Sequence, residues 1–80
     1  MKESIKQIKE AIELAGFERY NTRYYKEYNH YEFSIVFYKN FVVINIYHLT
    51  GTPDDVGTSF ETDSLDRIKA SIYGITGEKL

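Results

Sequence analysis

The fold is decided by two neighbouring segments, Tyr31–Tyr38 (YEFSIVFY) and Phe41–Leu49 (FVVINIYHL). Both are rich in β-branched and aromatic residues, and only Lys39-Asn40 separates them. Because Asn tolerates positive φ, this pair suits a two-residue turn and predicts a tight antiparallel hairpin. The predicted register places Phe37 opposite Val42, Ile35 opposite Ile44, Phe33 opposite Ile46, and Tyr31 opposite His48.

One side of this hairpin is almost wholly apolar, so we expect it to face the core. The other side has mixed polarity, and we expect at least half of it to be exposed to water. Its predicted cross-strand pairs are Tyr38 with Phe41, Val36 with Val43, Ser34 with Asn45, and Glu32 with Tyr47.

Residues 4–15 have the apolar spacing of an amphipathic helix. Ser4 begins a capping box, and Gly16 fits the left-handed position that ends a helix. Phe17 would then fold back on Ile12. The predicted apolar face consists of Ile5, Ile8, Ile12 and Ala15.

Less regular segments flank the hairpin. Residues 19–28 predict one further strand joined through Asn29-His30. A two-residue turn there would place Glu27 opposite Glu32, an unfavourable pair of like charges, so a longer or bulged turn is an alternative. Residues 50–59 predict a loop with a short edge strand near Thr58–Phe60.

A second helix follows this loop. Asp63 is its predicted cap, acidic residues lie at its positive N-terminal end, and Gly74 and Gly77 are expected to end it. Its apolar stripe consists of Leu65, Ile68 and Ile72.

These elements predict an α+β fold in which two helices pack on one face of a three- to four-stranded antiparallel sheet, in the order α-β-β-β-(β)-α. A chain of 80 residues has room for one core, so we expect a single domain over residues 1–80. Such a core is thin, and a homodimer would be an easy source of extra stability.

Composition limits the chemistry. The chain has no Cys, which removes disulfides and thiolate metal sites and favours the cytoplasm. We expect no signal peptide, because residues 1–16 alternate charges with isoleucines, and no membrane span, because no apolar stretch approaches about 18 residues. The net charge is −2, yet five acidic and no basic residues lie between Asp54 and Asp66.

The sequence offers no pattern for catalysis. His30 and His48 stand apart from other metal-ligating residues, and the glycines form neither a phosphate loop nor a dinucleotide fingerprint. We therefore expect a protein that is not an enzyme, with no catalytic residue, metal or cofactor.

The unusual feature is a basic, Tyr-rich stretch over residues 19–31. Interleaved aromatic and basic residues are typical of protein-binding patches, and also of single-stranded nucleic-acid binders. The acidic 54–66 segment disfavours nucleic acid, so a protein partner is our leading hypothesis and a nucleic-acid-binding domain the alternative. The residues expected to bind the partner are Arg23, Tyr25, Tyr38, Phe41 and Tyr47, with the acidic loop residues Asp54 and Asp55.

The order helix, three strands, helix is also that of double-stranded-RNA-binding domains. Those domains start their second helix with lysines that grip phosphates, whereas this chain has Thr62-Asp63-Ser64-Leu65-Asp66 there. We infer no membership. In size, acidity and aromatic content the chain is similar to small phage-encoded inhibitors of host defence, which leads us to expect an accessory or inhibitor protein of a phage or mobile element that binds a host protein.

Overall fold

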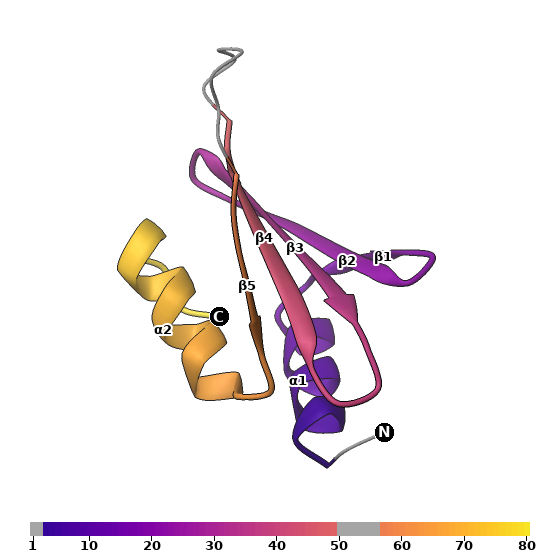
Figure 1. Ribbon diagram of the computed structural model, residues 1–80. Helices are drawn as coiled ribbons and strands as arrows, with labels where there is room; N and C mark the ends of the chain where they lie inside the picture. The colour runs from indigo at the N-terminus through magenta and orange to yellow at the C-terminus, as the bar shows by residue number, and fades with distance from the viewer. Residues whose placement is uncertain (1–2, 50–56) are drawn as a thin grey trace.

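The computed structural model describes residues 3–49 and 57–80. Five antiparallel strands form one sheet in the order β1-β2-β3-β4-β5, and both helices lie on the same side of it (Figure 1). The elements are α1 (Glu3–Leu14), β1 (Glu18–Tyr20), β2 (Arg23–Tyr28), β3 (Tyr31–Phe37), β4 (Val42–His48), β5 (Thr58–Thr62) and α2 (Leu65–Thr76).

The predicted fold class is confirmed, with five strands where three to four were expected. The extra strand arises because the segment predicted as one strand folds back on itself. Asn21 adopts a left-handed φ of 58°, which makes a turn between β1 and β2. The edge strand near Thr58–Phe60 is also present and extends to Thr62.

The central hairpin has the predicted register, from Phe37 opposite Val42 to Tyr31 opposite His48. The Tyr38 N–H donates to the Phe41 carbonyl at 2.9 Å, which closes the two-residue turn. The reason given for this turn was wrong, however. Among the described residues other than glycine, positive φ occurs at Asn21 and Asn29, so Lys39-Asn40 turns without it.

Asn29 supplies the left-handed residue of the β2–β3 turn, with a φ of 53°. Tyr28 then pairs with Tyr31, so the turn has two residues and the longer alternative is wrong. Glu27 consequently lies opposite Glu32. The like-charged pair is tolerable because it faces away from the helices and Glu27 is exposed, where water screens the repulsion.

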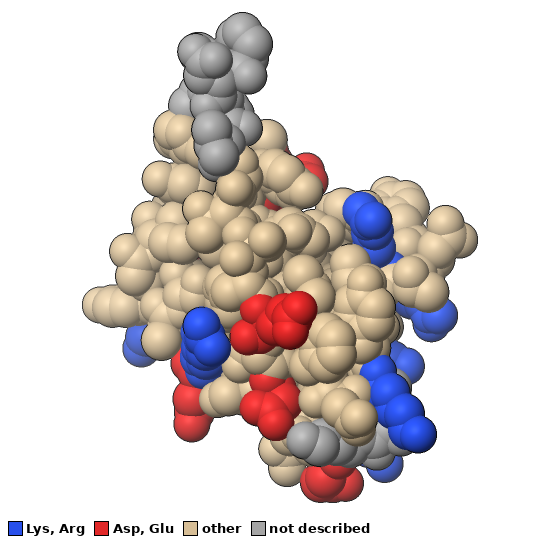
Figure 2. Space-filling model, in the orientation of Figure 1, with Lys and Arg blue, Asp and Glu red and all other residues tan. Residues whose placement is uncertain are grey.

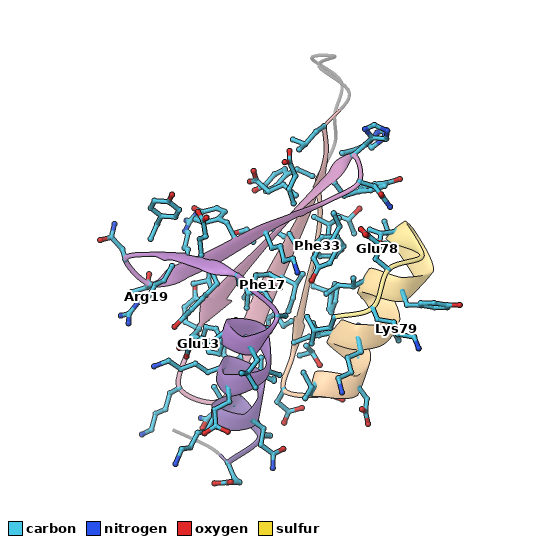
Figure 3. The ribbon with its side chains drawn as sticks, turned by 180° about the vertical axis from the view of Figure 1, so that it is seen from behind. Glu13, Phe17, Arg19, Phe33, Glu78 and Lys79 are labelled. Carbon is cyan, nitrogen blue, oxygen red and sulfur yellow. The ribbon has the colours of Figure 1, made fainter. Side chains whose placement is uncertain are left out.

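The core lies between the sheet and the two helices (Figure 3). Alternate residues of β2, β3 and β4 point into it, as the period of a strand requires. Isoleucines supply most of the helical contribution. The buried apolar side chains are Ile5, Ile8, Ile12, Phe17, Tyr24, Tyr28, Phe33, Ile35, Val42, Ile44, Ile46, Ile68 and Ile72.

Helix α1 ends in the predicted Schellman motif. Gly16 has a φ of 94°, its N–H donates to the Glu13 carbonyl at 3.2 Å, and the Phe17 N–H donates to the Ile12 carbonyl at 3.1 Å. The Lys26 ammonium of β2 also donates to the Ala15 carbonyl. This bond explains why a charged residue occupies the helix-facing side of β2. Ser4 lies inside the helix, which begins at Glu3, so its prediction as the N-cap is wrong.

The N-cap of α2 is Ser64 rather than the predicted Asp63. Ser64 is extended, with φ −108° and ψ 120°, and its side chain accepts a hydrogen bond from the Arg67 N–H. Gly77, at φ 76°, ends the helix, whereas Gly74 lies inside it. The amide of Asn29 donates to the Thr76 carbonyl at 2.9 Å, so the β2–β3 turn supports the C-terminus of α2.

Candidate functional site

The candidate site is the outer face, by which we mean the side of the sheet that points away from α1 and α2. Strand alternation and pairing assign its members, because residues paired across neighbouring strands share a face. All five predicted contact residues in the described strands and turns belong to this face: Arg23, Tyr25, Tyr38, Phe41 and Tyr47.

Two rows of cross-strand neighbours form the middle of the outer face. In the first row, Arg23 pairs with Val36, which pairs with Val43. The second row runs from Tyr25 through Ser34 to Asn45. The register thus places Arg23 and Tyr25 of β2 on the same face as Val36 of β3 and Val43 of β4.

A stacked aromatic pair closes the hairpin end of the outer face. The Tyr38 and Phe41 rings lie 4.9 Å apart with 17° between their planes. Tyr38 is 49% exposed, while Phe41 is half-buried. The two-residue turn fixes this pair next to the Val36–Val43 row, so it extends the apolar surface of the sheet.

Tyr47 lies near the opposite end and is 41% exposed. Its ring packs over Gly57, where a Cβ atom would come within 2.9 Å of the ring carbons Cδ1 and Cε1. Only glycine leaves room for this contact. One edge of the Tyr47 ring is therefore packed against the backbone at Gly57, while the rest of the side chain is exposed.

Ser34 occupies the centre of the outer face and is only 1% exposed. Its cross-strand neighbours are the larger residues Tyr25 and Asn45. Within the described part of the chain, the Ser34 hydroxyl has no hydrogen-bond partner. The middle of the face is thus tightly packed even though no helix lies on it.

Sequence reasoning missed three members of this surface: Tyr20, Val36 and Val43. Tyr20 is 60% exposed and its ring meets that of Tyr25 edge-on at 5.7 Å. The two valines were placed on this side of the hairpin but not among the contact residues. The alternation of side chains along the two strands was the sequence signal that could have identified them. The predicted loop contributors Asp54 and Asp55 lie outside the described residues.

The charge of the outer face is mainly negative. Among its described strand residues, four are glutamates and one, Arg23, is basic. Figure 2 shows this side of the molecule, on which Lys and Arg gather mainly along the right-hand edge and a broad area carries no charged side chain. The four glutamates are Glu18, Glu27, Glu32 and Glu61.

Three of these glutamates border a hollow of about 330 Å³ beside β1 and β2. Glu18, Glu27 and Glu32 line it with Tyr25 and Lys26. The residues from Glu3 to Leu49 and from Gly57 to Leu80 nevertheless include no group of His, Cys, Asp or Glu arranged to hold a metal ion. The hollow also includes Gly16 and so lies at the edge of the sheet, between its two faces.

Comparison with protein-family models, with curated proteins and with solved structures gives no match. Of the described helices, neither is long and apolar enough to cross a membrane.

One titratable group with a perturbed pKa, the Tyr28 phenol, lies on the helix side of the sheet. Burial, and secondarily the negative charge of Glu78, raise the pKa of the Tyr28 phenol. Tyr28 packs among Phe17 and Phe33 in the core, and its hydroxyl has no hydrogen-bond partner in the described structure. A protonated phenol held in an apolar core is not poised for proton transfer at neutral pH.

Proposed function

We propose that this protein is a non-enzymatic binding module that engages a protein partner through the outer face of its sheet. The observation that supports it is that Tyr25, Tyr38, Phe41 and Tyr47 share, with Val36 and Val43, a face that the helices leave open. Exposed aromatic side chains gathered on one surface are typical of interaction sites.

The geometry of these rings favours binding. Tyr38 is stacked on Phe41, and Tyr47 is held against Gly57, so neither ring has to lose much side-chain freedom when a partner covers it. Rings that are ordered before binding lower its entropic cost. Arg23 at the margin of the valine row adds a planar hydrogen-bonding group, a residue type enriched at binding hot spots.

The charge of the face favours protein over nucleic acid. The glutamates that flank the aromatic residues would repel phosphates, and phosphate contacts supply most of the affinity in non-specific nucleic-acid binding. A partner whose surface is apolar with basic groups at its margin fits better, because opposite charges then meet at the rim. We propose the cytoplasm as its location and a host protein as the partner of a phage or mobile-element accessory protein.

The test compares captured proteins between matched variants in extract from the native host. The wild type and the Tyr38→Ser, Tyr47→Ser double variant are tagged, and the bound proteins are quantified with and without nuclease. We expect a partner that survives nuclease and is lost with the double variant. Arg23→Ala should weaken its capture, and His30→Ala, in the β2–β3 turn, should leave it unchanged.

Thermal unfolding accompanies each capture, because the double variant has to stay folded for the comparison to count. Losing the stack on Phe41 and the contact with Gly57 should cost about 1 kcal/mol per site, which a folded domain can tolerate. A partner retained by the folded double variant, or lost only after nuclease, contradicts the proposal. A wild-type dimer in light scattering that the double variant converts to a monomer also contradicts it, because the face would then bind a second copy of the chain.

A further inference from the structure

A second candidate site lies on the other side of the sheet, at the β1–β2 turn. It is a hollow of about 160 Å³ lined by Lys9, Arg19, Thr22, Tyr24 and Phe37. Arg19 belongs to the helix side of the sheet because it pairs with Tyr24, which is buried. Figure 3 shows Arg19 on β1, on the side of the sheet where α1 lies.

The lining of this hollow divides into a cationic part and an aromatic part. Lys9 of α1 and Arg19 of β1 bring two positive charges from separate elements, and Thr22 adds a hydroxyl. Tyr24 and Phe37 form the apolar wall, with their rings edge-on at 5.4 Å. None of the described lining residues is acidic, in contrast to the glutamate-lined hollow beside β1 and β2.

Arg19 is held in place by its own turn. Its Nε donates to the Asn21 carbonyl at 2.8 Å, and Asn21 is the left-handed residue of the β1–β2 turn. The terminal nitrogens of the guanidinium are not used in this bond. The neighbouring Glu18 faces the opposite side of the sheet, where its carboxylate accepts a hydrogen bond from the Tyr20 hydroxyl at 3.3 Å. It therefore does not neutralise Arg19 within the hollow.

A phosphate monoester matches this lining. It is close to a dianion at neutral pH, since its second pKa is about 6, and it offers three acceptor oxygens. Arg and Lys donors form their strongest hydrogen bonds with such oxygens. The hollow has room for roughly five water molecules at about 30 Å³ each, enough for a phosphate and part of an apolar carrier.

We propose that the hollow binds a phosphate monoester carried on an aromatic or apolar group, with Lys9 and Arg19 holding the phosphate and Tyr24 and Phe37 contacting the carrier. The site is separate from the outer face, so this proposal does not depend on the proposed protein-binding function, and either can fail without the other. Its position on the helix side leaves both sites accessible at once.

The test is a nuclear magnetic resonance titration of the folded protein at constant ionic strength, which removes general screening effects. Three probes are compared: inorganic phosphate, phenyl phosphate and dimethyl phosphate. We expect saturable shifts of the Thr22 amide and the Arg19 Nε–H in the millimolar range, with phenyl phosphate tightest. Dimethyl phosphate, a monoanionic mimic of a nucleic-acid backbone, should bind most weakly.

Matched variants distinguish binding at this site from non-specific electrostatic attraction between the anionic probe and the protein. Arg19→Gln and Lys9→Gln should each weaken phenyl phosphate by about fivefold or more, because each removes one of two cations. Lys6→Gln removes the same charge from an exposed position one turn earlier on α1 and should have little effect. Non-saturating shifts, equal effects of Lys6→Gln and Lys9→Gln, or dimethyl phosphate binding as tightly as phenyl phosphate would each overturn the proposal.

Discussion

Replacing Ile44 by Ala tests the assignment of the two sheet faces most directly. Ile44 is 1% exposed and lies between Ile35 of β3 and Phe60 of β5. The substitution removes three carbons, each contributing about 0.8 kcal/mol when buried, and leaves a cavity. We therefore expect a loss of about 3–4 kcal/mol. A domain of 80 residues has roughly 4–12 kcal/mol in total, so this loss is a large fraction.

Val43→Ala is the matched control, because Val43 is the next residue along β4 and faces outward. It loses two carbons from a half-buried position, so we expect a cost of about 0.8 kcal/mol. Urea unfolding followed by circular dichroism gives both free energies of unfolding, and an unchanged m-value shows that the unfolded state is the same. Equal losses at the two positions would refute the assignment, since the outer face would then be covered.

Three further substitutions test individual contacts. Tyr28→Phe should not lower stability at pH 7, because it removes a buried hydroxyl without a partner in the described structure. The raised folded-state pKa of Tyr28 makes stability depend on pH: the contribution of the protonated phenol is complete below about pH 10 and is lost as the pH rises from there through the folded-state pKa. The wild type should therefore lose more stability than Tyr28→Phe in alkaline urea titrations. Ser64→Ala should cost about 1 kcal/mol in thermal unfolding, and the exposed Ser59→Ala in β5 under 0.5 kcal/mol; equal values would contradict the N-cap. Asn29→Gly keeps the left-handed φ but loses the hydrogen bond to Thr76, which should cost about 1 kcal/mol of stability. Asn29→Ala should cost about 1 kcal/mol more, because Ala is strained at this φ, and a larger loss for Gly than for Ala would contradict the left-handed turn.

The central hairpin could be predicted from the sequence because two signals agree there. Large apolar residues recur at every second position of β3 and β4, and a slip of one position would have moved Ile35 and Ile44 to the solvent side. The end of α1 could be predicted from the sequence in the same way. Gly16 followed by an apolar residue is a local pattern, and its hydrogen bonds depend only on neighbours in the chain.

A strand before the hairpin was predicted, but its division into β1 and β2 was not, because that division depends on the conformation of one turn residue. A three-residue strand such as β1 has little alternation to recognise, and the turn that creates it depends on one left-handed Asn21. Lys26 breaks the apolar pattern of β2 because it binds the end of α1, a partner 11 residues away. The Glu27–Glu32 pair was weighed as unfavourable, yet the turn geometry and solvent exposure outweigh it.

The candidate site was predictable as a set of positions but not as a surface. The alternation of side chains along each strand was enough to place Tyr38, Phe41 and Tyr47 on one side of the hairpin. Whether that side was open depended on where the helices dock, which alternation does not encode. The contact of Tyr47 with Gly57 also joins two segments whose intervening loop gave no pairing signal.

The sheet order β1-β2-β3-β4-β5 means that each strand pairs with its neighbour in the chain. The contact order of the sheet is therefore low, and closing its two-residue turns costs little chain entropy. The helices are different, since α1 and α2 come from opposite ends of the chain and still touch each other. We expect the strands to assemble quickly as successive hairpins, and the meeting of the two terminal helices to be the slow, rate-determining step of folding.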